Sequence, residues 1–127
     1  MILFVCTGNT CRSAMAEALL RHGLRERGPD ACVVASVGTE GGGSPATYQA
    51  VEVLAARGID LAEHRSRQLT TESVADAHLI VAMTRRHEAA VTALVPAARS
   101  RTFLAGEVAR VVEGVWAVGE GGVVAWV

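Results

Sequence analysis

The sequence predicts an α/β domain with a four-stranded parallel sheet and helices on both of its faces. Short apolar runs alternate along the chain with longer stretches of helical periodicity. Each apolar run is continuous, which suits a strand that is buried on both faces, as the strands of parallel sheets are. A chain of 127 residues, half of them apolar, is long enough to bury such a core within one domain.

The predicted strands and helices follow one another with little chain between them. Strands are predicted over residues 2–5, 32–37, 78–83 and 101–105, and helices over residues 13–28, 46–58 and 86–95. An additional short helix is expected within residues 70–77. In the first helix, apolar residues recur at helical spacing until Gly28 and Pro29 end it. Because strands and helices alternate, we expect right-handed crossovers between the parallel strands.

Composition and charge exclude several classes of partner. The net charge of -1 gives no electrostatic basis for binding nucleic acid or an anionic membrane surface. The apolar stretch at residues 1–5 is too short for a signal-peptide core or a membrane span, so a cytoplasmic protein is expected. Neither the three cysteines nor the four histidines show the spacing of a metal site, and an odd number of cysteines argues against a disulfide framework. No metal or other cofactor is expected.

A loop of distinctive residues separates the first predicted strand from the first predicted helix. Backbone N–H groups and the dipole of a helix N-terminus converge on such a loop in parallel α/β folds, and together they attract anions. Gly8 and Asn9 tolerate positive φ, so successive N–H groups can turn inward. The planar guanidinium of Arg12 can hold two oxygens of a tetrahedral anion at once. We therefore expect a loop that binds phosphate or sulfate, formed by Thr7, Gly8, Asn9, Thr10, Cys11, Arg12 and Ser13.

Cys6 stands directly before this loop. The helix N-terminus, the inward N–H groups and Arg12 all favour the thiolate, which is the nucleophilic form of cysteine. A free cysteine is more often a small buried apolar side chain. Here, however, the glycine, asparagine, arginine and serine of the loop follow a buried strand and open a helix. This joint pattern favours a nucleophile at Cys6.

These residues resemble those of the low-molecular-weight protein tyrosine phosphatases, including their protein-arginine phosphatase branch. The resemblance begins with VCTGNTCRSAMAEALL at residues 5–20. It continues with SVGT at 36–39, AVEVLAARGIDLAEHRSRQLT at 50–70 and ADAHLIVAMTRRH at 75–87. The segments stand in the family's order and at about its spacing, so the likeness covers residues 2–107.

The resemblance implies catalytic roles for Cys6 and Arg12, and a contact with the sulfur for Ser13 of the phosphate-binding loop. Cys6 is expected to attack phosphorus and form a phosphocysteine that water then hydrolyses. Arg12 is expected to bind the equatorial oxygens of the transition state. Ser13 is expected to form a hydrogen bond with the thiolate or with the departing thiol.

The resemblance also implies supporting roles around the loop. Ser36 and His64 are expected to hold Asn9 and thereby the strained shape of the loop. For His64 the alternative is an ordinary surface histidine. Cys11 is expected either to form a reversible disulfide with the nucleophile under oxidation or simply to pack. Cys32 lies inside a predicted strand and is expected in the core.

The sequence departs from the family near its end. Enzymes of the family carry an Asp-Pro pair on a late loop, whose aspartate protonates the leaving group and later activates water. No aspartate follows Asp76, and gap-free counting from FLAGE at 103–107 places the expected motif on VGEGG at 118–122. Glu120 is the nearest carboxylate and the candidate surrogate acid, with a solvated loop residue as the alternative. Because losing a positioned acid removes about 10²- to 10⁴-fold in rate, a slow reaction is expected.

The chain ends at Val127, whereas relatives continue into another helix. We therefore expect one domain over residues 1–127 whose C-terminal part is atypical or truncated. The apolar tail is expected to support self-association.

Three functions compete at this stage. The first is a protein phosphatase that acts on phosphotyrosine or phosphoarginine, and on small phosphomonoesters, through a cysteinyl-phosphate intermediate. Thr10 resembles the arginine-phosphatase branch, where a small hydroxyl residue replaces a bulky aliphatic one. The alternative is a non-catalytic module that binds phosphate or phosphoproteins. Arsenate reduction comes last, because no cysteine follows Cys32 to relay a disulfide.

Overall fold

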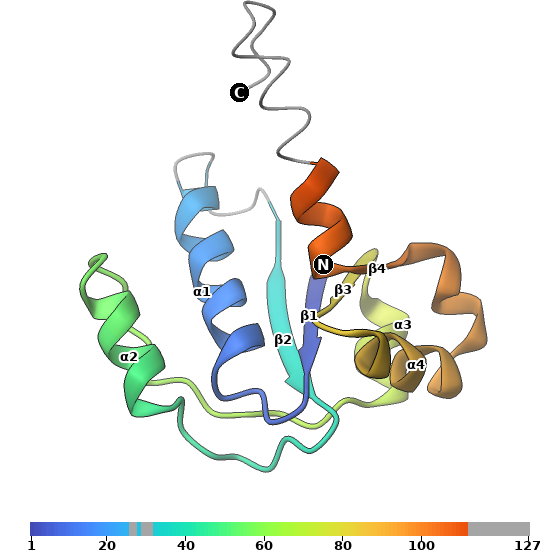
Figure 1. Ribbon diagram of the computed structural model, residues 1–127, viewed down its shortest axis with the longest axis horizontal. Helices are drawn as coiled ribbons and strands as arrows, with labels where there is room; N and C mark the ends of the chain where they lie inside the picture. The colour runs from blue at the N-terminus through green and yellow to red at the C-terminus, as the bar shows by residue number, and fades with distance from the viewer. Residues whose placement is uncertain (26–27, 29–31, 112–127) are drawn as a thin grey trace, which may run out of the picture.

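The computed structural model describes residues 1–25, 28 and 32–111. One sheet contains four parallel strands in the order β2-β1-β3-β4. The strands are β1 (Ile2–Cys6), β2 (Val34–Gly38), β3 (Leu79–Ala82) and β4 (Thr102–Leu104), and the α-helices are α1 (Arg12–Leu24), α2 (Tyr48–Ala55), α3 (Thr71–Asp76) and α4 (Arg85–Leu94). Helices α1 and α2 lie on one side of the sheet, and α3 and α4 lie on the other (Figure 1). The predicted α/β fold is therefore confirmed.

Two apolar clusters form the core, one between the sheet and two helices and the other between α1 and α2. On one side, a cluster joins side chains of β1, β2 and β3 to α3 and α4, and its fully buried members include Leu3, Val5, Val74, Ile80 and Val91. On the other side, Ala14 of α1 packs with α2 and the segment that follows it, in a cluster containing Ala50, Leu54, Ile59 and Leu61. The first cluster therefore fixes α3 and α4 on the sheet, and the second fixes α2 against α1.

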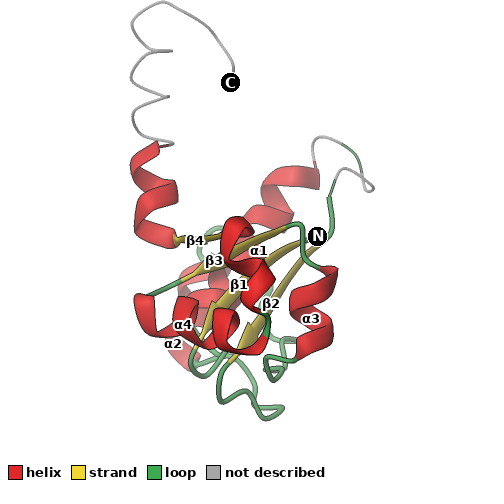
Figure 2. Cartoon of the chain, turned by 90° about the vertical axis from the view of Figure 1, so that its right-hand side faces the viewer, coloured by secondary structure: helices red, strands yellow, loops and turns green. Residues whose placement is uncertain are grey.

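The sheet order places the start of the β1–α1 loop at the carboxyl ends of the strands, next to the middle of the sheet. Strand β1 pairs with β2 on one side and with β3 on the other. The chain leaves β1 toward α1 and leaves β3 toward α4, so it passes to opposite faces of the sheet from neighbouring strands (Figure 1). Such a switch point is where parallel α/β sheets bind ligands. Loops gather at this end of the sheet in Figure 2.

Several predicted boundaries differ from those observed. Helix α1 ends at Leu24, before the Gly28 predicted from the sequence. Strand β2 begins at Val34 because its first partner, Ile2, is also the first residue of β1. The prediction that Cys32 lies in a strand and in the core was therefore wrong, since it precedes β2 and is only half-buried.

Residues toward the end of the described chain form structure that the sequence left unassigned. A 3₁₀ helix over Pro96–Arg101 leads into β4, and residues 105–111 are helical. The expected late-loop motif, the candidate acid Glu120 and the self-associating tail all lie outside the described residues. One domain over residues 1–127 likewise stays a prediction. Across the described ranges, no helix combines the length and the apolar character needed to cross a bilayer.

Candidate active site

The predicted loop lies between the last residue of β1 and the first turn of α1. Cys6 ends β1 and is 3% exposed, while Arg12 begins α1 and is exposed. Cys11 occupies the N-cap position of α1, and its side chain forms no capping hydrogen bond with the helix. The first N–H groups of α1 are thus not capped by this side chain, and the helix dipole favours an anion at this end.

Cys6 Sγ accepts hydrogen bonds from one side chain and one backbone group. Ser13 Oγ lies 2.8 Å from the sulfur, and the backbone N–H of Asn9 donates to it over 3.2 Å. Two donors, one from the loop and one from the first turn of α1, thus point at the sulfur. The side chain of Cys6 is therefore buried at the start of the loop and held there by two hydrogen bonds.

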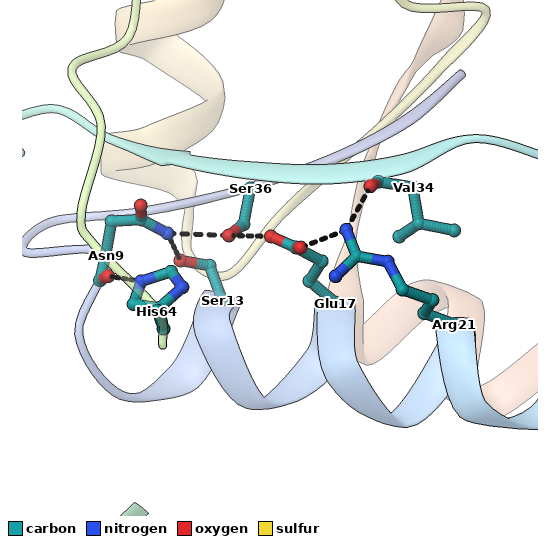
Figure 3. Close-up of polar contacts among 7 residues, drawn as sticks. All are labelled: Asn9, Ser13, Glu17, Arg21, Val34, Ser36 and His64. Atoms are coloured by element: carbon teal, nitrogen blue, oxygen red, sulfur yellow. Dashed lines mark hydrogen bonds and ion pairs between the residues drawn. The ribbon is translucent and has the colours of Figure 1, made fainter. Parts of the chain in front are cut away.

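Asn9 holds the centre of the loop. Its φ of 55° lies in the left-handed region, and its side chain is fully buried. The amide Nδ2 donates to Ser13 Oγ and to Ser36 Oγ, both over 2.8 Å, and Oδ1 accepts from the backbone N–H of Arg67 over 2.9 Å. His64 Nε2 donates to the Asn9 carbonyl over 2.6 Å (Figure 3). The structure thus brings Asn9, Ser36 and His64 together, and these bonds offset the backbone strain.

Glu17 fixes the direction of the hydrogen bonds that lead to Cys6. Its side chain, on a residue that is 7% exposed, accepts the hydroxyl proton of Ser36 over 2.5 Å and pairs with Arg21 (Figure 3). Because Ser36 donates its only proton to Glu17, its oxygen is the acceptor for the Asn9 amide. The other amide hydrogen of Asn9 goes to Ser13, which leaves the Ser13 hydroxyl proton for Cys6. From the sequence alone, Glu17 fits an ordinary helical ion pair with Arg21, although its position four residues after Ser13 puts both on one helix face.

The segment after β2 lies against the loop backbone. The N–H groups of Thr39 and Glu40 donate to the carbonyls of Cys6 and Thr7 over 2.9 and 2.8 Å. Gly38 permits this approach, because a Cβ there would lie 2.4 Å from the Thr7 carbonyl oxygen. Farther along, the N–H of Thr47 donates to the Thr10 carbonyl over 2.8 Å. The loop is thereby held at both of its ends.

His87, which sequence reasoning missed as a site residue, contacts the loop from the α4 side. Its Nε2 lies 2.8 Å from Thr7 Oγ1, and its Nδ1 accepts the Thr84 backbone N–H over 3.1 Å. Burial, followed by the charges of Arg12 and Arg86, lowers the pKa of His87. The sequence does offer one signal for His87. It stands three residues after Thr84, the N-cap of α4, and the β3–α4 turn lies at the same end of the sheet as Cys6.

The lowered pKa of His87 gives the folded state a defined dependence on pH. Well above pH 6.5, the ordinary pKa of histidine, the imidazole is neutral in both the folded and the unfolded chain. In that range His87 adds no pH dependence to the free energy of unfolding. Below 6.5 the unfolded chain binds a proton that the folded chain resists, and the free energy of unfolding is expected to fall until the folded pKa is reached. Urea unfolding between pH 7 and pH 5 is expected to show a smaller loss for His87→Gln than for the wild type. The exposed His22→Gln is the matched control, and equal slopes for His87→Gln and the wild type would contradict the assignment.

Comparison with known proteins adds the family to this geometry. The family model described as low molecular weight phosphotyrosine protein phosphatase matches residues 1–114. A probable low molecular weight protein-tyrosine-phosphatase of Ralstonia nicotianae is 42% identical over 106 residues, which span 84% of this chain and 70% of the relative. A protein-arginine-phosphatase of Geobacillus stearothermophilus is 42% identical over 102 residues, spanning 80% of this chain and 66% of the relative.

A solved structure carries the same likeness in three dimensions. It is that of a YwlE arginine phosphatase variant with a phosphorylated active-site serine, with 38% identity and a TM-score of 0.75. The match covers 81% of this chain and 67% of the other. The fold, the loop after β1 and these relatives agree, and the chain therefore belongs to the low molecular weight phosphotyrosine protein phosphatase family.

Proposed function

We propose that this protein removes phosphoryl groups from protein side chains through a covalent phosphocysteine at Cys6. The observation that carries the proposal is the buried thiol of Cys6, which receives hydrogen bonds from Ser13 and Asn9 beside a helix N-terminus. The relatives named as tyrosine and arginine phosphatases support the reaction class. The phosphorylated active-site serine in the arginine phosphatase variant supports covalent phosphorylation of an active-site side chain.

The reaction has two displacements at phosphorus. In the first, an electron pair of the Cys6 thiolate forms the S–P bond while the bond from phosphorus to the leaving oxygen or nitrogen breaks. The leaving group takes a proton as it departs, and the carboxyl group of Glu120, our proposed acid, supplies it. In the second, the Glu120 carboxylate takes a proton from water as the water oxygen bonds to phosphorus, the S–P bond breaks, and its electron pair returns to Cys6. Arg12 and the loop N–H groups hold the nonbridging oxygens, while Ser13 donates to the returning thiolate.

A covalent intermediate is directly detectable. The protein is mixed with p-nitrophenyl phosphate, quenched in acid during turnover, and digested for mass spectrometry. We expect release of nitrophenol together with the mass of one phosphoryl group on the peptide that contains Cys6. Binding of inorganic phosphate without any release of nitrophenol would instead identify the non-catalytic module.

For the substrate, we propose phosphoarginine in preference to phosphotyrosine. The support is Thr10, a small half-buried loop residue whose carbonyl is fixed by Thr47. The Geobacillus arginine phosphatase and the Ralstonia tyrosine phosphatase are both 42% identical to this chain. Overall sequence identity therefore does not choose between the two substrates. The measurement is kcat/KM on matched phosphoarginine and phosphotyrosine peptides, and a higher value for phosphotyrosine would overturn this preference.

For the leaving-group acid, we propose Glu120. A positioned acid matters most when the leaving group is a poor one and least when the leaving group is stable as an anion. Glu120→Gln is therefore expected to slow hydrolysis of phenyl phosphate while leaving that of p-nitrophenyl phosphate nearly unchanged. Equal effects on both substrates would remove Glu120 from the mechanism.

We also propose a cytoplasmic location, which gives the protein access to phosphorylated proteins.

A further inference from the structure

The phosphate loop is held on its α4 side through a side chain. Thr7, the residue after the nucleophile, is fixed twice. Its carbonyl accepts the Glu40 N–H over 2.8 Å, and its hydroxyl oxygen lies 2.8 Å from His87 Nε2. The second contact joins residues that are 80 positions apart, and His87 is 4% exposed. It links the loop to the face of the sheet opposite α1.

The protonation pattern of the His87 ring follows from its neighbours. A backbone N–H can only donate, so the Thr84 N–H at 3.1 Å requires Nδ1 to be an acceptor. The Thr84 hydroxyl lies 3.0 Å from the same nitrogen and can donate to it as well. The proton of the neutral ring is therefore on Nε2 and is donated to Thr7 Oγ1.

We propose that His87 is a positioning residue for the phosphate loop, and that as the Nε2-protonated neutral ring it fixes Thr7 beside the nucleophile. This inference rests on the proposed function of the loop as a phosphate site. The loop N–H groups bind an anion well only if they point inward before the anion arrives. Asn9 fixes the middle of the loop through its own contacts, whereas the His87 contact fixes its first residue. Loss of the Thr7–His87 bond is therefore expected to weaken phosphate binding more than global stability.

The charges around the ring oppose its protonation. The guanidiniums of Arg12, from α1, and Arg86, from α4, both act on His87, and burial acts in the same direction, so its pKa is lowered. The nucleophile Cys6 is the neighbour of Thr7 in the chain. A proton on Nδ1 would face the Thr84 N–H, and two donors would then oppose each other. The positioning contact is therefore intact at neutral pH.

The test is a double-mutant cycle on phosphate affinity. Thr7→Val removes the acceptor with little change of shape, and His87→Leu removes the donor. We expect each to raise the dissociation constant of inorganic phosphate, measured by calorimetry, by about tenfold, as expected for loss of one organising hydrogen bond. The double variant is expected to match the single variants, because both act through the same bond. His87→Gln, which retains a donor near the position of Nε2, is expected to stay within about threefold of the wild type.

Two further measurements do not depend on turnover: the protonation of the His87 ring, and the phosphate affinity of a control variant at another histidine. The ring nitrogen chemical shifts of wild-type His87 are expected to show a protonated Nε2 and a bare Nδ1. The control His78→Gln replaces a histidine that contacts the N-terminal amine and is expected to leave phosphate affinity unchanged. Additive losses in the double variant, wild-type affinity in Thr7→Val, or a proton on Nδ1 would each overturn the inference. Failure of the proposed function would differ, because turnover would then be absent while the cycle on phosphate binding still held.

Discussion

Replacing Cys6 by serine is expected to abolish turnover of p-nitrophenyl phosphate while leaving inorganic phosphate bound. Serine keeps the shape of the side chain and can still contact Ser13, which lies 2.8 Å from the sulfur. A hydroxyl is far less ionised than a thiol at neutral pH, so the nucleophile is lost. We expect kcat to fall by about 10³-fold or more. The charge of Arg12 and the loop N–H groups remain, so phosphate should inhibit or bind with similar affinity.

The comparison requires a second thiol as a control. Cys32 is half-buried, precedes β2 and lies outside the loop, so Cys32→Ser is expected to turn over at the wild-type rate. Phosphate binding is measured by calorimetry on all three proteins, with nitrophenol release followed in parallel. Undiminished turnover by Cys6→Ser would show that another group attacks phosphorus. Loss of phosphate binding in the serine variant alone would show that the thiolate also holds the loop in shape.

The loop itself was predictable because its information is local. Strand, loop and helix follow one another over residues 2–24, and the apolar run, Gly8, Asn9 and Arg12 each predict their part from neighbouring positions. The contacts that hold the loop are different in kind. Ser36 and His64 meet Asn9 across 27 and 55 residues, and family resemblance rather than spacing pointed to them.

The features that could not be predicted from the sequence depend on contacts between distant parts of the chain. The Thr7–His87 contact joins residues that are 80 positions apart, and no hydrophobic periodicity near either residue predicts it. Glu17 fits an ordinary helical ion pair with Arg21 until the packing of α1 against β2 buries it beside Ser36. Cys32 was placed in a strand from its apolar neighbours, whereas the start of β1 decides where that strand begins. In each case the deciding partner is remote in the chain.

Asn9→Asp is expected to cause the largest loss of stability among single changes at the site. The two side chains have nearly the same shape, but the carboxylate replaces two amide donors to Ser13 and Ser36 with an acceptor. The new charge would be fully buried, near the carboxylate of Glu17 and the thiolate of Cys6. A buried charge without a counterion costs about 3–5 kcal/mol of folding free energy.

The same change is expected to redirect the Ser13 proton. Its hydroxyl, which donates to Cys6 in the wild type, would find a stronger acceptor in the introduced carboxylate, and the thiolate would lose one of its two donors. We expect kcat/KM for p-nitrophenyl phosphate to fall by about 10²-fold. The destabilisation relative to the wild type should lessen as pH falls, because protonation removes the buried charge and restores one donor.

Asn9→Gly separates the backbone from the side chain in this experiment. Glycine adopts the φ of 55° without strain, so this variant loses the hydrogen bonds of the amide but introduces neither strain nor charge. Urea unfolding at pH 7 is expected to rank the wild type above Asn9→Gly, and Asn9→Asp last. An Asn9→Asp protein within about 1 kcal/mol of the wild type, near the centre of the distribution for point mutants, would show that Asn9 does not organise the loop through its amide. The opposite order of the two variants would show that the lost side chain and the greater freedom of glycine in the unfolded chain cost more than the buried charge.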